Sequence, residues 1–208
     1  MPLSRRSLLV LAPALALAPP ATARAADPRL AERAVGSATA PVSVIEFFSL
    51  TCPHCARFAR DSLPEIQAKL IDAGKLRYVF HDYPLDQVAL MAAQVAHALP
   101  PDRYEPFTLA LLAAQDRWAF ARGVDSRAEL GKMAALAGLS QAAFNAAVDD
   151  TGLRDAILAQ QDADTKTYAI NSTPSFVFNG ASAHNRLESG EMTYAGFAKV
   201  VTEAGPPA

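Results

Sequence analysis

The chain contains two cysteines, Cys52 and Cys55, within the segment Cys-Pro-His-Cys. Two thiols at this spacing can form a reactive disulfide, form a structural disulfide, or supply two ligands to a metal. A bridge that closes so short a loop restricts the unfolded chain little, so it adds little stability. We therefore interpret Cys52 and Cys55 as a redox-active pair, with a structural disulfide and half of a metal site as the alternatives.

The sequence around the pair predicts a strand followed directly by a helix. Residues 42–49 are almost continuously apolar and β-branched or aromatic, which is typical of a strand buried on both faces. Cys52 would then lie at a helix N-terminus, where unpaired amides and the helix dipole favour a thiolate. Pro53 suits the first helical turn, and a protonated or hydrogen-bonding His54 would also favour the thiolate. Cys55 would be the buried resolving thiol.

Glu46 is a carboxylate in this strand at a position where a hydrophobic residue is expected. It would share one face of the strand with Val44 and Phe48. Burial would raise its pKa, and the carboxyl group could then exchange a proton with Cys55. The alternative is a carboxylate at the strand end that reaches solvent or pairs with a lysine such as Lys75.

The remaining patterns predict an α/β fold whose sheet is interrupted by helices. Residues 76–81 read as a second strand, which completes a strand–helix–strand unit. Residues 86–168 are rich in alanine and predict an all-helical insertion. After Thr173-Pro174 the expected elements are a strand, an Asn-Gly turn, a short strand and a final helix, at residues 175–178, 179–180, 186–187 and 193–203. We expect one domain from residues 26–85 and 169–208.

Several local signals predict where helices begin, bend and end. Pro64 should kink the helix that starts at Cys52, and Pro106 should lie in the first turn of a helix over residues 104–114. Ser126, with Glu129 three residues on, fits a capping box. Ser140 and Thr151 can cap two further helices, the second ending at Tyr168, and Gly74 and Gly138 suit helix ends.

The first 25 residues have the layout of a secretory signal peptide. Arg5 and Arg6 precede a short apolar run over residues 8–18, and small residues suitable for cleavage end at Ala25. The apolar run is too short for a membrane-spanning helix, which needs about 20 residues. The paired arginines also resemble a twin-arginine signal, so either the Sec or the twin-arginine route is open. Both would deliver the protein outside the cytoplasm, which we expect to be the periplasm.

The composition indicates a globular protein that does not bind polyanions. The 208 residues are 51% hydrophobic and 19% charged, with a net charge of −2. Removal of residues 1–25 takes away three arginines and no acid, which leaves 16 basic against 21 acidic side chains. Since no basic run is visible, nucleic acids and anionic membrane surfaces are not expected partners.

The order of these features resembles the DsbA-like thiol:disulfide oxidoreductases of the thioredoxin superfamily, over residues 42–203. The resemblance rests on a strand ending in Glu46-Phe47-Phe48, on Cys-Pro-His-Cys at a helix start, on the helical insertion, and on Thr173-Pro174 before a late strand. It implies a thioredoxin fold with an inserted all-helical domain. It also implies a buried acid at Glu46 and a cis Thr173-Pro174 bond against the cysteines, where the Thr173 backbone could pair with a substrate segment.

The resemblance implies an exported enzyme that gives its Cys52–Cys55 disulfide to reduced, unfolded or partly folded exported proteins. A quinone-linked membrane oxidase would re-oxidise it, and we expect a monomer that needs no cofactor or metal. The alternatives are a disulfide reductase or isomerase, and a metal-binding protein that uses Cys52, Cys55 and His54. Isomerases usually carry an N-terminal dimerisation domain, for which residues 27–40 leave no room, and structural zinc normally takes four protein ligands.

Other chemically capable residues are expected to be structural. Three histidines lack a partner at ligand spacing, and four large apolar residues of the insertion fit core packing better than a substrate groove: His81, His97 and His184; Phe107, Leu111, Leu112 and Trp118.

Overall fold

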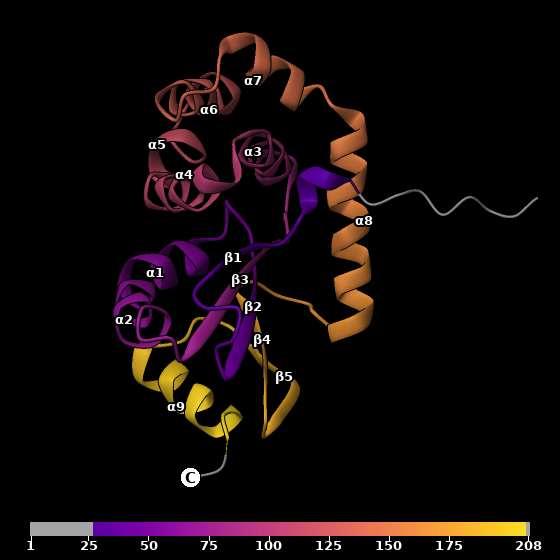
Figure 1. Ribbon diagram of the computed structural model, residues 1–208. Coiled ribbons are helices and arrows are strands. Elements are labelled where there is room, and N and C mark those ends of the chain that lie inside the picture. Colours follow the sequence, from indigo (N-terminus) through magenta and orange to yellow (C-terminus); the bar gives the residue numbers. More distant parts are fainter. Residues whose placement is uncertain (1–26, 207–208) are drawn as a thin grey trace, which may run out of the picture.

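The computed structural model describes residues 27–206, and the predicted signal peptide lies outside this range. A mixed sheet forms its centre, with strand order β1-β3-β2-β4-β5 (Figure 1). β2 pairs with β3 in parallel, and the other neighbouring pairs are antiparallel. The strands are β1 Arg33–Val35, β2 Val42–Phe48, β3 Leu76–Asp82, β4 Ser175–Gly180 and β5 Ala183–Ser189.

The helices lie on both faces of the sheet and beyond one end of it. α1, α2 and α9 lie on one side of the sheet, α8 runs along the other, and α3 to α7 form the upper part of the molecule in Figure 1. Their bounds are α1 Pro53–Asp61, α2 Leu63–Ile66, α3 Gln87–Ala98, α4 Pro101–Ala113, α5 Gln115–Trp118, α6 Ser126–Leu136, α7 Gln141–Val148, α8 Thr151–Tyr168 and α9 Tyr194–Ala204. A short 3-10 helix spans Pro28–Leu30, and a π-helical turn spans Gln67–Ile71.

The strand that carries Glu46 has the predicted division of faces. Val44 and Phe48 belong to the main core on the side of α1 and α9, whereas Phe47 belongs to a separate cluster on the opposite side. Both faces are covered, which explains why the sequence of β2 is apolar without alternation. Glu46 therefore points into the main core.

Aromatic side chains fill the layer between the sheet and the helices that carry the cysteines and the C-terminus. Phe58 of α1 and Phe197 of α9 pack against Phe176 of β4, with ring centroids 4.7 and 5.6 Å apart from it. Phe197 also stacks on Tyr78 of β3 at 6.3 Å. Rings of this size fix the position of α1 over the sheet, because they bury large areas in defined orientations.

Polar contacts attach the helical insertion to the sheet. His97 of α3 lies 2.8 Å from Asp82, which also accepts a hydrogen bond from Tyr104 at 2.7 Å. His81 lies 3.0 Å from Asp164 of α8. Trp118 is fully buried and donates to the Leu111 carbonyl at 2.8 Å. These side chains have structural partners, as the sequence predicted for the two histidines and for Trp118.

The local signals were right about most ends but wrong about some positions. Ser140 caps α7, and Gly138 has the positive φ of a helix end. α6 and α8, however, are capped by Asp125 and Asp150, one residue before the predicted Ser126 and Thr151. An aspartate that precedes a hydroxyl residue is an equally good acceptor, so the cap moved by one position.

Two prolines act differently from the prediction. Pro64 does not kink a continuous helix, because α1 ends at Asp61 and Pro64 lies in the first turn of α2. α4 begins at Pro101, so Pro106 lies inside it rather than in its first turn. The helix there gives up one backbone donor, since proline has no N–H.

The Asn-Gly pair does not form the predicted hairpin turn. Asn179 and Gly180 belong to β4, and the chain turns at residues 181–182. A Cβ at Gly180 would overlap the backbone oxygen of Ala204, which explains the glycine by close packing. β1, at the sheet edge, was also missed, because the predicted lead-in over residues 27–40 offered too few apolar residues. Within residues 27–206 no helix is long and apolar enough to cross a membrane.

Candidate active site

Cys52 lies where the parallel strand β2 gives way to α1. It is the N-cap of α1, Pro53 is the first helical residue, and the Cys52 carbonyl accepts the first helical hydrogen bond from Ala56 at 3.1 Å. The cysteines are free thiols here, with Cys52 4% exposed and Cys55 fully buried. The predicted difference between an outer and an inner thiol is therefore present.

The loop before Cys52 is held by two side chains from the helical insertion. Gln115 donates to the carbonyls of Leu50 and Cys52, at 2.8 and 3.0 Å. Thr51 donates through Oγ1 to Asp86, the N-cap of α3, at 2.7 Å. Since both anchors are buried or partly buried, the backbone that presents Cys52 has a defined geometry.

The surroundings of the two sulfurs shift their pKa values in opposite directions. Hydrogen bonding from the Cys55 thiol is the main cause that lowers the pKa of Cys52 to about 5. The Thr173 side chain and the amides of Cys55 and His54 also lower it, and burial opposes them. Burial raises the pKa of Cys55 well above its ordinary value, and the nearby Cys52 and Glu46 raise it further. Cys52 is therefore the thiolate at neutral pH and Cys55 the thiol.

Thr173-Pro174 packs directly against Cys52, as the resemblance implied. The peptide bond between them is cis, and the Cys52 sulfur lies 3.3 Å from the Thr173 carbonyl oxygen. The Thr173 hydroxyl is buried and makes no hydrogen bond among residues 27–206. Its side chain nevertheless contributes to the low pKa of Cys52.

His54 is turned toward the loop between β5 and α9. Its Nδ1 lies 3.1 Å from Glu191 and 2.6 Å from Arg57, and Arg57 also donates to Glu191 at 2.9 Å. The His54 side chain is 59% exposed, so these charges add little stability. The His54 backbone amide favours the Cys52 thiolate, whereas a tuning role for its imidazole stays a prediction.

Glu46 is buried and accepts a hydrogen bond from Tyr78. It is 3% exposed, and the Tyr78 hydroxyl donates to Oε2 at 2.7 Å. Burial raises the pKa of Glu46 to about 7, the Tyr78 hydrogen bond opposes this, and the Cys52 charge adds to it. Lys75 is not a partner, so the interpretation as a surface ion pair is wrong.

An open groove of about 730 Å³ runs beside the dithiol. His54 and Ser62 border it on the side of α1, and Thr173, Glu191 and Met192 border it on the other side. Ser62 donates to the Met192 carbonyl at 2.8 Å, and Gly190 donates to the Pro174 carbonyl at 2.8 Å. The segment after β5 is therefore tied to the end of α1 and to the cis-proline loop at the borders of this groove.

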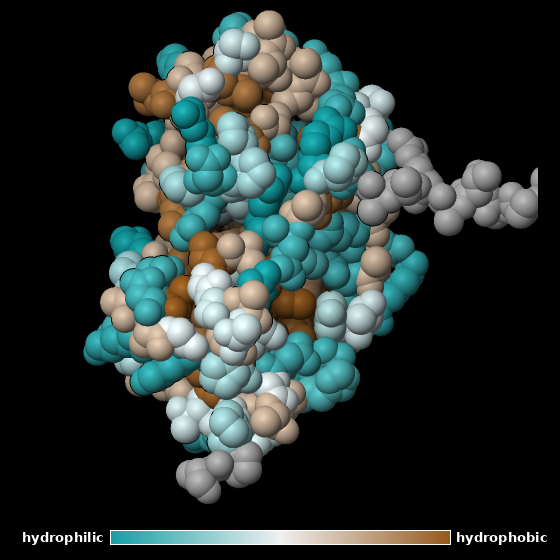
Figure 2. All heavy atoms as spheres, viewed as in Figure 1, coloured by the Kyte–Doolittle hydropathy of each residue, from teal (hydrophilic) through white to brown (hydrophobic). Residues whose placement is uncertain are grey.

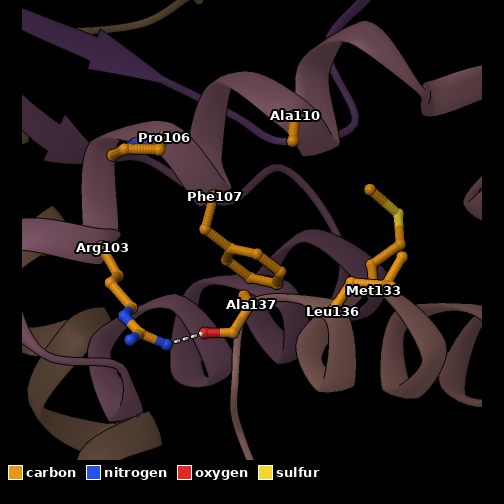
Figure 3. Close-up of a pocket in the computed structure, with 7 residues that line it drawn as sticks. All are labelled: Arg103, Pro106, Phe107, Ala110, Met133, Leu136 and Ala137. Atoms are coloured by element: carbon orange, nitrogen blue, oxygen red, sulfur yellow. Dashed lines mark hydrogen bonds between the residues drawn. The ribbon is translucent and has the colours of Figure 1, made fainter.

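A second groove, of about 410 Å³, lies between α4 and α6 and is mostly apolar. Figure 3 shows its lining, with Phe107 between the two helices and Arg103 bonded to the Ala137 carbonyl. Phe107 borders this groove but belongs to the core, as do Leu111 and Leu112, which agrees with the expectation of core packing. No predicted site residue lies along it. On the face in Figure 2, hydrophobic residues appear as patches, several of them between the upper helices and the lower part that holds the sheet.

The metal-binding alternative finds no ligand set in the described part of the chain. There, no three or more histidine, cysteine, aspartate or glutamate side chains are grouped so that they could hold a metal ion.

Four residues of the site were not predicted from the sequence: Tyr78, Asp86, Gln115 and Glu191. Each contacts the site across at least 30 residues of sequence. Gln115 sits in an alanine-rich helical stretch where a polar residue predicts an exposed position. Local patterns carry no signal for contacts of this kind.

The site and fold together define a class of protein. A dithiol at a helix N-terminus, facing a cis-proline loop on a mixed sheet, is the arrangement of thioredoxin-fold thiol–disulfide exchange proteins. The family model described as thioredoxin matches residues 29–200. The chain therefore belongs to the thioredoxin family, and its solved neighbours make it a DsbA-like member.

Two solved structures of Wolbachia pipientis alpha-DsbA1 variants are similar to this chain. A threonine-to-valine variant matches with a TM-score of 0.76 at 29% identity, and a double cysteine variant matches with a TM-score of 0.75 at 31% identity. Each match covers 83% of this chain and 90% of the neighbour. A Rickettsia typhi protein, provisionally named a protein-disulfide oxidoreductase, is 28% identical over 152 residues, 73% of this chain. The chain spans only 56% of that relative's length. These findings confirm the predicted family and the predicted thioredoxin fold with a helical insertion.

Replacing Gln115 with Leu should destabilise the protein and weaken the thiolate. Two carbonyls lose their donor, which costs about 1–3 kcal/mol in the free energy of unfolding, measured by urea titration. The loosened helix start should also raise the pKa of Cys52, measured by thiolate absorbance at 240 nm. Gln94→Leu is the control, because Gln94 is equally buried but donates to carbonyls of the insertion alone. An equal shift in both variants would contradict the role of Gln115.

The reduced protein should show a thiolate titration with a midpoint about pH 5. Cys55→Ala removes the main donor to Cys52 and should move this midpoint upward, because the thiolate loses a hydrogen bond. Cys55→Ser keeps a donor at the same place and should move it less. If the alanine and serine variants titrate alike, hydrogen bonding from residue 55 is not the main cause.

Glu46→Gln should stabilise the reduced protein at high pH but not at low pH. The pKa of Glu46 rises from 4.5 to about 7 on folding, so stability is lost as the pH rises from about 4.5 through 7. The variant should therefore gain about 3 kcal/mol over the wild type between pH 4 and pH 8. Urea unfolding at both pH values measures this, with the surface variant Glu65→Gln as the control. A pH-independent difference would show that Glu46 is not buried as an acid.

Proposed function

We propose that the protein is an exported thiol:disulfide oxidoreductase that donates its Cys52–Cys55 disulfide to newly secreted proteins. The observation that carries this proposal is the position of Cys52 at the start of α1, 3.3 Å from the Thr173 carbonyl oxygen, with Cys55 fully buried behind it. These surroundings lower the pKa of Cys52 to about 5 and raise that of Cys55 well above its ordinary value. Stabilising the Cys52 thiolate stabilises the reduced form, so the disulfide form becomes a stronger oxidant. The names of the relatives and neighbours support the same chemistry.

Donation takes place in two exchange steps. A substrate thiolate attacks the Cys52 sulfur, which forms a mixed disulfide and releases Cys55 as a thiolate. A second substrate thiolate then attacks the substrate sulfur of the mixed disulfide and releases Cys52. The substrate loses two electrons and the enzyme disulfide gains them. The low pKa of Cys52 makes it a good leaving group in the second step.

Glu46 supplies and removes the proton of Cys55. The released Cys55 thiolate takes up a proton readily because its pKa is raised. Glu46, with a pKa of about 7, exists in both protonation states near neutral pH and is close enough to raise the pKa of Cys55 by its charge. A group that titrates near the working pH is the best proton donor and acceptor.

The substrate is a reduced, unfolded or partly folded polypeptide. An extended segment would lie in the groove beside Thr173 and pair with its backbone as an added strand, which suits an unfolded chain. The Thr173 carbonyl already lies against the Cys52 sulfur, so a segment paired there would have its own cysteine next to Cys52.

Export and re-oxidation rest on the sequence and the family. Residues 1–25 would act as a cleaved signal peptide for the Sec or twin-arginine route, with the periplasm as destination. Residues 26–85 and 169–208 would form the catalytic domain and 86–168 the insertion. A membrane oxidase linked to quinones would restore the disulfide, and the protein would act as a monomer.

The test measures the direction of electron flow and the identity of the nucleophile. The reduction potential, from equilibration with glutathione, should lie nearer the value known for DsbA, about −120 mV, than that of thioredoxin, about −270 mV. Cys55→Ser should accumulate mixed disulfides with exported proteins through Cys52, because the resolving thiol is missing. A potential near that of thioredoxin would favour the reductase alternative, and equal trapping by Cys52→Ala would overturn the role of Cys52.

A further inference from the structure

The hydrogen bond between Tyr78 and Glu46 joins two neighbouring strands beneath the dithiol. In the parallel β2–β3 pair, Tyr78 is opposite Val44 and Glu46 is opposite Phe80, so the two residues are diagonal neighbours on one face. Tyr78 is fully buried, and its hydroxyl lies 2.7 Å from Glu46 Oε2. This is the only hydrogen bond to the Glu46 carboxyl group within residues 27–206.

The packing of Tyr78 fixes the direction of its hydroxyl. Its ring stacks on Phe197 at 6.3 Å and packs against Phe80 at 5.0 Å. Burial and the Glu46 charge raise the pKa of Tyr78 well above its ordinary value, so the hydroxyl keeps its proton and donates. It occupies Oε2, which leaves Oε1 to exchange a proton.

Within residues 27–206, no cation is among the groups that shift the pKa of Glu46. The titratable groups that act on Glu46 are Tyr78 from β3 and Cys52 from the start of α1. The charge of Glu46 acts in turn on Cys55. Glu105 of α4 acts on Tyr78 and is itself an acid. Since every other charge in the group is negative, the Tyr78 hydroxyl is what favours the ionised form of Glu46.

We propose that Tyr78 is a positioning residue for disulfide exchange, whose hydroxyl sets the ionised fraction of Glu46 and leaves one carboxylate oxygen free for the Cys55 proton. This inference rests on the proposed function, because it concerns the acid that serves Cys55. It assigns a role to a residue that makes no hydrogen bond to either sulfur within residues 27–206.

The step most sensitive to Tyr78 is closure of the Cys52–Cys55 disulfide from a mixed disulfide. The Cys55 thiol gives its proton to the Glu46 carboxylate, and the Cys55 sulfur then attacks the Cys52 sulfur. The partner sulfur that was bonded to Cys52 takes the electron pair of that bond and leaves as a thiolate. Closure therefore needs ionised Glu46. Opening needs protonated Glu46, so loss of the Tyr78 hydroxyl slows closure at neutral pH without slowing opening.

Glutathione disulfide provides the test. It forms a mixed disulfide with Cys52, which closes and releases a second glutathione, and acid-quenched samples can be followed by mass spectrometry. In the wild type the closure rate should rise with pH through a midpoint below the pKa of about 7 that Glu46 has in the reduced protein, because Cys52 carries no charge in the mixed disulfide. In Tyr78→Phe the midpoint should move up by about one to two pH units, the effect of one hydrogen bond to a charge. Closure at the wild-type midpoint should then slow by about five-fold or more.

Three further proteins separate this role from a loss of packing. Tyr104→Phe is the matched control, because Tyr104 is equally buried and donates to the Asp82 carboxylate at 2.7 Å; its midpoint should stay at the wild-type value. In a Glu46→Gln background, Tyr78→Phe should not change the pH profile. Wild-type protein made with 3-fluorotyrosine, whose hydroxyl is a stronger donor, should show a lower midpoint, and this measurement does not depend on the folding of a variant.

The outcomes distinguish this inference from the proposed function. If Tyr78→Phe folds and keeps the wild-type midpoint, or if fluorotyrosine leaves the midpoint in place, the role of Tyr78 is wrong. If Tyr104→Phe shifts the midpoint equally, the effect is a general one of packing. In each case the wild type still exchanges disulfides through Cys52. Failure of the wild type to form the mixed disulfide at all would overturn the proposed function itself.

Discussion

The charge on the Cys52 sulfur is the quantity on which the other features of the site act. A thiol with an ordinary pKa is mostly protonated at neutral pH and is both a weak nucleophile and a poor leaving group. Here Cys52 is the N-cap residue of α1, and the Cys55 thiol, the Thr173 side chain and the amides of Cys55 and His54 together lower the pKa of its sulfur to about 5. Cys55, one helical turn further into the core, has only the backbone of Ser49 to favour its thiolate, and burial keeps it a thiol.

Such a difference between two sulfurs three residues apart requires a fixed backbone, and the fold supplies it from distant parts of the chain. The insertion holds the carbonyls before α1 through Gln115 and the loop through Asp86. The cis-proline loop is tied to the segment after β5 by the bond from Gly190 to Pro174. The helical insertion is therefore part of the site's support as well as a cover for the sheet.

The sequence predicted the parts of the site that depend on neighbouring residues. Cys52, Pro53 and Cys55 lie within four consecutive residues, so one strand-to-helix pattern predicts the positions of all three. The apolar run around Glu46 predicts that this carboxyl group is buried. The predicted place of Thr173 against Cys52 came from the family resemblance alone, because 120 residues separate the two positions. Gln115 and Glu191 escaped prediction for the same reason of distance, with no family signal to replace it.

The errors in the fold have a related physical cause. Asp125 and Asp150 displaced the predicted caps because several acceptors stood side by side, and only packing decides which backbone conformation precedes the helix. Asn179-Gly180 is a turn signal by its conformational freedom, yet Gly180 is needed for the close approach of Ala204. A glycine that serves packing cannot be distinguished from one that serves a turn by its neighbours in the sequence.

The coupling between Cys52 and Glu46 connects the charge on the sulfur to proton transfer. The Cys52 thiolate raises the pKa of Glu46, so the reduced enzyme favours a protonated acid. When Cys52 enters a mixed disulfide its charge is lost, and the pKa of Glu46 must fall. The carboxylate then becomes available at the stage when Cys55 has to give up its proton for closure. The pKa of the buried Glu46 therefore depends on the redox state of Cys52. The hydrogen bond from Tyr78 sets the pKa from which these changes start.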